Sequence, residues 1–194
     1  IGMPAAIFWG LIIFGTLPIA VFGLVFADEI KTVARDLRLT ASMLIIFGIL
    51  LYLADRFRPQ AKEQKDLTLK DGMIFGFAQA LALIPGVSRS GATITAGRML
   101  GYNRETAARF SFLLSIPAIV LSGLFEMKDI GSSGSVPWGP TIVATIVSFA
   151  VGYASIAWLL KWLTSHSVLV FTVYRIVVGL GIFALLGAGV LASG

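Results

Sequence analysis

Residues 73–98 read MIFGFAQALALIPGVSRSGATITAGR, and this stretch decides how the chain folds. The apolar run 73–87 would form a helix of about 22 Å, shorter than the roughly 30 Å hydrocarbon core of a bilayer. Pro85 removes a backbone donor and ends that helix, and Gly86 permits a sharp turn. The charged Arg89 follows at once. Two interpretations stay open: one kinked span, or a re-entrant hairpin over about residues 72–100.

The composition around this stretch is that of an integral membrane protein. Hydrophobic residues make up 57% of the 194 residues and charged residues 13%, about half the share in soluble domains. The mean hydropathy of +0.92 excludes an ordinary soluble or disordered chain. The net charge of +5 lies in short loops between apolar runs, so we expect no nucleic-acid partner.

Runs without charge predict five transmembrane helices and a single polytopic membrane domain over residues 1–194. The expected spans cover about residues 5–27, 39–54, 110–126, 139–160 and 168–190. The pattern Thr68-x-x-Asp71 predicts a capping box at the start of the first limb of the hairpin. Two glycine patterns, Gly72-x-x-x-Gly76 and Gly97-x-x-x-Gly101, predict close helix packing.

The distribution of Lys and Arg favours the re-entrant interpretation. If residues 72–97 re-enter, nine basic residues lie in the loops on one side of the membrane and four on the other. If they span, the counts are six and seven, which gives no clear positive-inside bias. The re-entrant arrangement makes the loop 55–71 cytoplasmic and places the C-terminus outside.

The broken helix predicts an anion-binding loop. Ser88 and Ser90 are good caps for a helix that starts near residue 91, and Gly91 lets a ligand approach the backbone. The free amides and the dipole of that helix favour an anion, and Arg89 adds a fork of donors suited to phosphate. A charged residue at this depth is a functional candidate. The alternative is that Arg89 pairs with carbonyl groups at helix ends and only holds the hairpin together.

Other polar residues near the loop are weaker candidates. Gln79 and Thr93 are predicted to bind substrate, although a buried amide contact and a bond to its own helix are the respective alternatives. Arg175 is expected to snorkel or to anchor an interface, and a substrate role is the alternative. The chain has no cysteine and one histidine, and the carboxylates nearest to the loop in sequence are Asp71 and Glu105. We therefore expect no metal ligands in this chain and no general acid or base beside the loop.

The run GFAQALALIPGVSRSGATITAGRMLGYNRETAARFSFLLSIPAI, residues 76–119, closely resembles the second signature of the bacterial undecaprenyl-diphosphate phosphatase family, named for bacitracin resistance. The resemblance implies hydrolysis of undecaprenyl diphosphate to the monophosphate and inorganic phosphate, which recycles the lipid carrier for peptidoglycan synthesis. Arg89 carries over as the catalytic, phosphate-binding arginine, flanked by Ser88 and Ser90. The implied location is the bacterial inner membrane. Membrane lipids, the lipid substrate and a second copy in a homodimer are the implied partners.

The family fold is an inverted repeat with two re-entrant hairpins, and this sequence matches its second half. The family's first signature, with glutamates, a Ser-Ser pair and a histidine, has no match here. The chain starts at Ile1 without a recognisable signal peptide, so we expect further sequence upstream. The resemblance also implies Mg²⁺ or Ca²⁺, with its ligands in that N-terminal part. This chain alone is therefore expected to be incomplete for catalysis.

One function from a different class competes with hydrolysis. A polyprenyl-phosphate flippase or transporter would use the same broken helix as a binding site for the head group. Such a protein would move the lipid without releasing phosphate. A phosphatidic-acid-type phosphatase is excluded, because Thr95 stands where that motif has a histidine.

Overall fold

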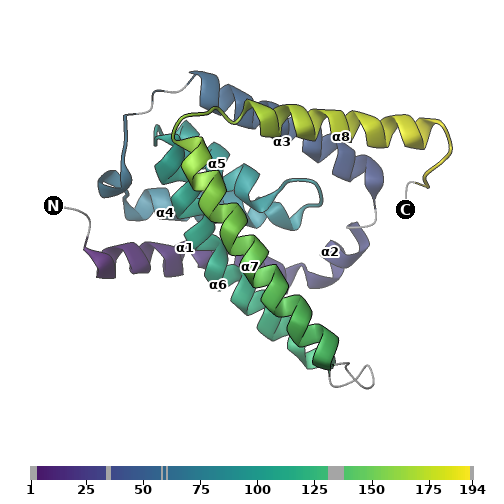
Figure 1. Cartoon of the computed structure of the whole chain (residues 1–194), viewed down its shortest axis with the longest axis horizontal. Helices are drawn as coiled ribbons and strands as arrows, with labels where there is room; N and C mark the ends of the chain where they lie inside the picture. Colours follow the sequence, from purple (N-terminus) through teal and green to yellow (C-terminus); the bar gives the residue numbers. More distant parts are fainter. Residues whose placement is uncertain (1–3, 34–35, 58, 60, 131–137, 193–194) are drawn as a thin grey trace.

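The computed structural model describes residues 4–33, 36–57, 59, 61–130 and 138–192, and this part of the chain is helical (Figure 1). Its long helices are α1 (Ala5–Val25), α3 (Leu37–Phe57), α6 (Arg104–Ile130), α7 (Trp138–Leu163) and α8 (Leu169–Gly187). The shorter ones are α2 (Ala27–Val33), α4 (Leu69–Ala80), α5 (Arg89–Met99) and two 3-10 turns, η1 (Gln64–Asp66) and η2 (Leu81–Leu83). The all-α prediction is confirmed.

Five of these helices are long and apolar enough to cross a membrane: α1, α3, α6 over Arg104–Phe125, α7 and α8. They overlap the five ranges expected from the sequence, and α6 begins earlier than expected, at Arg104. Their outer faces carry large exposed apolar side chains, as helices in contact with lipid do. The chain is therefore a multi-pass helical membrane protein.

Residues 73–98, which were expected to decide the fold, do not form one continuous helix. Helix α4 ends at Ala80, η2 adds one tight turn, and α5 begins at Arg89 after a loop. At the start of α4, the Thr68 hydroxyl accepts from the Asp71 amide and the Asp71 carboxylate accepts from the Thr68 amide, as the capping box predicted. Helices α4 and α5 pack against each other as the two limbs of a hairpin. Re-entry into the bilayer and the inverted repeat stay predictions.

Glycine brings α1 and α4 into backbone contact. A side chain at Gly76 would overlap the carbonyl oxygen of Gly15, and one at Gly15 would lie 2.9 Å from the carbonyl oxygen of Gly72. Gly97 also packs closely, since a side chain there would lie 2.6 Å from the ring of Phe75. Gly101 was predicted to pack closely, and this was wrong. It lies in the turn after α5 with a φ of 91°, a conformation that favours glycine.

The hydrophobic core lies between α1, α4, α5 and α6. Phe75 is its centre, with its ring 4.7 Å from that of Phe110 and 6.2 Å from that of Tyr102. Leu11, from α1, and Leu114, from α6, belong to the same cluster. Burial of such side chains is worth about 1.5–3 kcal/mol each, so this core fixes the hairpin against its neighbours.

Helices α3 and α8 form a pair along one side of the molecule (Figure 1). Gly48 and Gly179 allow this approach, because a side chain at Gly179 would lie 2.9 Å from the carbonyl oxygen of Ala41. Helix α3 also packs on α5, whereas α7 packs mainly on α6. The α3–α8 pair thus lies beside the second limb of the hairpin.

Candidate functional site

The loop between η2 and α5 is a tight turn held by its own backbone. The Val87 amide donates to the Ile84 carbonyl at 3.2 Å, and Gly86 has a φ of 86°. A side chain at Gly86 would also overlap the carbonyl of Thr40 in α3. Position 86 therefore requires glycine for two reasons, its backbone conformation and its contact with α3.

Ser88 caps α5, which begins at Arg89, two residues before the start expected from the sequence. Its hydroxyl accepts from the Gly91 amide at 3.2 Å, and its carbonyl accepts from the Ala92 amide at 2.9 Å. Ser88 has a φ of 60° and is the one non-glycine residue with a positive φ in the described part of the chain. Such strain is typical of positions that serve a ligand site.

The amides of Arg89 and Ser90, in the first turn of α5, are free to bind a ligand. No backbone or side-chain acceptor among the described residues receives a bond from either group. The guanidinium of Arg89 likewise has no ion pair or hydrogen bond with the described residues, and the side chain is half-buried. Two amides and one guanidinium at the positive end of a helix are groups that suit an anion, so this loop is the candidate site.

Arg175, from α8, binds the backbone of this loop. Its side chain is buried, and it donates to the carbonyl groups of Gly86 at 2.8 Å and Val87 at 3.2 Å. A second terminal nitrogen lies 2.8 Å from the point where a side chain would begin at Gly91. Arg175 thus fixes the loop and adds positive charge beside the start of α5.

Gln79, Gly91 and Thr93, which were also predicted to bind substrate, are all buried in the structure. The Thr93 side chain is fully buried, and its hydroxyl bonds to the Arg89 carbonyl and to Ser111, so no free hydroxyl faces a ligand. Gln79 is fully buried too, and neither atom of its amide has a partner in the described part of the chain. The Gly91 amide is bonded to Ser88. The substrate-binding roles of these residues stay predictions.

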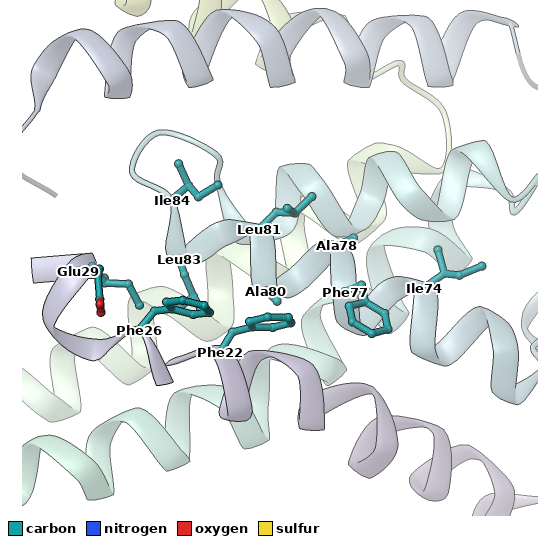
Figure 2. Close-up of a pocket in the computed structure, with 11 residues that line it drawn as sticks. Phe22, Phe26, Glu29, Ile74, Phe77, Ala78, Ala80, Leu81, Leu83 and Ile84 are labelled. Carbon is teal, nitrogen blue, oxygen red and sulfur yellow. The ribbon is translucent and has the colours of Figure 1, made fainter. Parts of the chain in front are cut away.

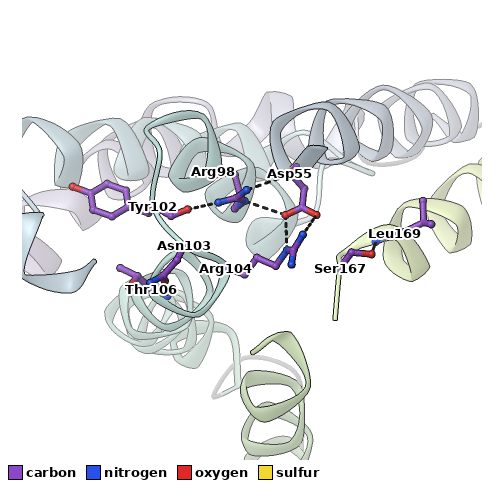
Figure 3. A network of polar contacts seen from close by, with 8 residues as sticks. All are labelled: Asp55, Arg98, Tyr102, Asn103, Arg104, Thr106, Ser167 and Leu169. Carbon is purple, nitrogen blue, oxygen red and sulfur yellow. Dashed lines mark hydrogen bonds and ion pairs between the residues drawn. The ribbon is translucent and has the colours of Figure 1, made fainter. Parts of the chain in front are cut away.

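The other end of α5 is held by buried charges (Figure 3). The Asp55 carboxylate accepts from Arg98 at 3.0 Å and from Arg104 at 2.8 and 3.0 Å. Arg98 is completely buried and also donates to the carbonyl groups of Tyr102 and Asp55. Removing a charged group from water is costly unless an opposite charge and hydrogen bonds compensate for the lost hydration. The network fastens the end of α5 to the end of α3.

A second polar cluster fastens the start of α4. The Tyr102 hydroxyl donates to the Asp71 carboxylate at 2.8 Å and contacts the Asp66 carbonyl at 3.0 Å. Burial opposes ionisation of Asp71, but hydrogen bonds from Thr68 and Tyr102 outweigh it and hold its pKa below the usual value. Burial, followed by the bond to Asp71, raises the pKa of Tyr102 above its ordinary value. Both limbs of the hairpin are therefore anchored at their ends away from the loop.

The family model of the bacitracin resistance protein BacA matches residues 3–181, which is most of the chain. The chain belongs to the BacA family. An "Undecaprenyl-diphosphatase 2" of Streptomyces avermitilis is 50% identical over 94% of this chain and 67% of its own length. The undecaprenyl-diphosphatase of Micrococcus luteus is 52% identical over 98% of this chain and 70% of its own length.

A divalent metal ion, expected for the BacA family, does not fit the described residues. No three histidine, cysteine, aspartate or glutamate side chains lie together in the ranges that the structure describes. Asp55 is the buried carboxylate of the charge network, and two arginines already occupy it.

Sequence reasoning underestimated two residues of this BacA chain. Arg175 was expected to anchor an interface, but it directly supports the candidate site from 89 positions away. Asp55 was placed at the start of a polar loop, yet it is buried among arginines. The sequence signal for Arg175 is a single charge in an otherwise apolar run, the same signal that pointed to Arg89.

Proposed function

We propose that this chain hydrolyses undecaprenyl diphosphate as part of an undecaprenyl-diphosphate phosphatase. The observation that carries the proposal is the loop at the start of α5, where two amides and the Arg89 guanidinium have no partner among the described residues. These groups would bind the diphosphate, while Arg175 holds the loop in place. The relatives from Streptomyces and Micrococcus carry the name of this activity.

In the proposed reaction, water adds its oxygen to the terminal phosphorus, and the bond from that phosphorus to the bridging oxygen breaks. The bridging oxygen stays on the prenyl phosphate, and inorganic phosphate leaves. Arg89 is the catalytic residue of this chain, because it would neutralise the charge that gathers on the departing oxygen. The amides of Arg89 and Ser90 would orient the diphosphate for attack. Catalysis would also need the first signature of the family, which the resemblance places ahead of these residues.

Release of phosphate tests the proposal and separates it from the flippase alternative. The full-length protein in detergent should release inorganic phosphate from undecaprenyl diphosphate, and Arg89→Ala should reduce the rate at least 100-fold. Arg56→Ala removes another arginine, an exposed one whose ring contact is with Phe57, and should leave the rate unchanged. Movement of the lipid between leaflets without release of phosphate would overturn the proposal.

We further propose the bacterial inner membrane as the location, because the carrier lipid for peptidoglycan is used there. Membrane lipids would cover the exposed apolar side chains of the long helices, such as Phe149 and Tyr153 on α7. A homodimer is proposed from the resemblance alone. Cross-linking in membranes before detergent is added would test it, and a monomer at all protein densities would contradict it.

A further inference from the structure

Arg175, on α8, is a buried cation without a carboxylate partner in the described part of the chain. Arg98 is the other buried arginine among the described residues, and it is paired with the Asp55 carboxylate at 3.0 Å. The hydrogen bonds of Arg175 all go to backbone carbonyl groups, which carry no net charge. Because a buried charge is costly without an opposite charge, an anion beside Arg175 would stabilise it.

One terminal nitrogen of the Arg175 guanidinium is available to such an anion. Nε and Nη2 make its three bonds to backbone carbonyl groups, whereas Nη1 donates to no described residue. The unpartnered side-chain atoms that are closed to solvent in the described ranges belong to Gln79 and Thr172. Nη1 is not among these closed atoms, so a ligand has access to it.

Nη1 of Arg175 lies at the start of α5, beside the candidate site. It is 2.8 Å from the point where a side chain would begin at Gly91, and the side chain of Ser88 is 3.2 Å from the same point. The absence of a side chain at Gly91 thus makes room for a guanidinium nitrogen. The free amides of this first turn are those of Arg89 and Ser90. Nη1 therefore adds a charged donor to the end of a helix that already favours an anion.

The apolar groove between α1 and α2 on one side and α4 and η2 on the other is no competing site for an anion (Figure 2). Apart from Glu29, on α2, its described lining consists of apolar residues. A carboxylate repels a phosphate group, and the groove offers no cation to offset this repulsion. The start of α5, with Arg89 and Arg175, is where the charges favour a diphosphate.

We propose that Arg175 is a direct ligand of the diphosphate, with Nη1 donating to a phosphoryl oxygen at the start of α5. The proposal rests on the proposed function and adds a second arginine to the binding site. Hydrogen bonds between charged groups are about twice as strong as neutral ones. The bonds from Nη2 to Gly86 and Val87 already fix the guanidinium, so little side-chain freedom is lost when the ligand binds.

Gly91→Ala tests the proposal without removing the arginine. The added methyl group would begin 2.8 Å from Nη1 and displace it. For the full-length protein and farnesyl methylenediphosphonate, which is not hydrolysed, we expect the Kd to rise about tenfold, as for the loss of one charged hydrogen bond. The unfolding temperature without ligand should not fall, because alanine favours a helix more than glycine does. Gly152→Ala, at a position of α7 with open space around it, is the control.

An unchanged Kd for Gly91→Ala would overturn the proposal, with or without a fall in the unfolding temperature. Arg175 would then only hold the loop, or would pair with a carboxylate of the full-length protein. A fall in stability with no loss of affinity is the result expected for such a pair.

A double substitution separates displacement of Nη1 from direct obstruction of the ligand. Lysine has no Nη1, so in the Arg175→Lys background Gly91→Ala should change the Kd less than twofold. A further tenfold rise in that background would show that the methyl group itself blocks the ligand, and would overturn the proposal. The analogue binds without hydrolysis. Binding that depends on Arg175, without release of phosphate from undecaprenyl diphosphate, would therefore contradict only the enzymatic function.

Discussion

The guanidinium of Arg175 donates a hydrogen bond of 2.8 Å to the carbonyl of Gly86, a residue 89 positions earlier in the chain. The same side chain reaches the Val87 carbonyl and lies 3.4 Å from the Leu44 carbonyl of α3. The last membrane helix and an earlier one therefore meet at the candidate site. The loop that presents Arg89 is fixed by contacts from outside its own hairpin, which keeps its amides in position for a ligand.

Replacing Arg175 by lysine should disturb the loop although the charge is kept. Lysine is a point charge on a flexible stem and lacks the planar fork that reaches both carbonyl groups. We expect Arg175→Lys to lower the free energy of unfolding by about 1–3 kcal/mol and to reduce kcat/KM for the lipid diphosphate. Thermal unfolding and phosphate release in detergent would measure both. Tyr174→Phe, at the exposed neighbouring position, is the control, and an Arg175→Lys variant equal to it would contradict the positioning role.

Two substitutions at Ser88 should separate the cap from the backbone strain. Ser88→Ala removes the hydroxyl that accepts from Gly91 and keeps the positive φ, so we expect a loss of about 1 kcal/mol. Ser88→Gly also removes the hydroxyl, but it relieves a strain worth about 1–3 kcal/mol. The glycine variant should therefore be at least as stable as the wild type. Chemical unfolding of both variants would decide the matter, and a glycine variant less stable than the alanine variant would show that Ser88 is not strained.

Tyr102→Phe should change how stability depends on alkaline pH. Because the pKa of Tyr102 is raised in the folded protein, its contribution is fully present below the unfolded-state pKa of 10.0 and is lost as the pH rises above it. The phenylalanine variant should be less stable by about 1 kcal/mol near neutral pH. It should also lose less stability than the wild type between pH 10 and 11. Tyr153→Phe, on the exposed surface of α7, should behave as the wild type does.

Asp55→Asn should be among the most destabilising substitutions in the chain. It removes the charge that compensates Arg98, which is completely buried, and it weakens the bonds from Arg104. Breaking a buried pair costs about 3–5 kcal/mol. The unfolding temperature in detergent would show the loss, with Asp28→Asn at an exposed position as the comparison. A loss as small as that of Asp28→Asn would mean that Asp55 does not hold the end of α5.

Gln79→Leu tests the predicted substrate role of a buried amide. Both polar atoms of Gln79 lack partners among the described residues, so the leucine variant loses no hydrogen bond there and should be at least as stable. If the amide binds substrate, the KM for the lipid diphosphate should rise while the unfolding temperature does not fall. A variant with an unchanged KM would remove Gln79 from the site.

The sequence predicted those features that depend on neighbouring residues. Hydropathy over about 20 residues located the long helices, and Pro85 with Gly86 located the break between α4 and α5. The helix caps at Thr68 and Ser88 could also be predicted from the sequence, because the donor and the acceptor of each capping bond are three residues apart. The loop between η2 and α5 follows from these local rules, and its role in binding an anion stays a prediction.

Contacts between segments that lie far apart in the sequence could not be predicted in this way. The approach of Arg175 to Gly86, and of Asp55 to Arg98, depends on which helices pair, and apolar patterns do not specify that in a bilayer. Gly101 illustrates the same limit, since its spacing from Gly97 matched a packing pattern but its backbone forms a turn. A glycine pattern alone does not distinguish close packing from a change of chain direction.

Helix α3 contacts the loop–α5 segment at both ends, with Thr40 against Gly86 and Asp55 against Arg98. These two attachment points on α3 are about 22 Å apart, since each helical residue advances about 1.5 Å. The length of this one helix thus sets how far the arginine loop reaches from the charged base of the hairpin. Inserting a single residue between the two points would rotate one of them by about 100° and break the alignment. The spacing between Thr40 and Asp55 therefore cannot change without moving the loop that carries Arg89.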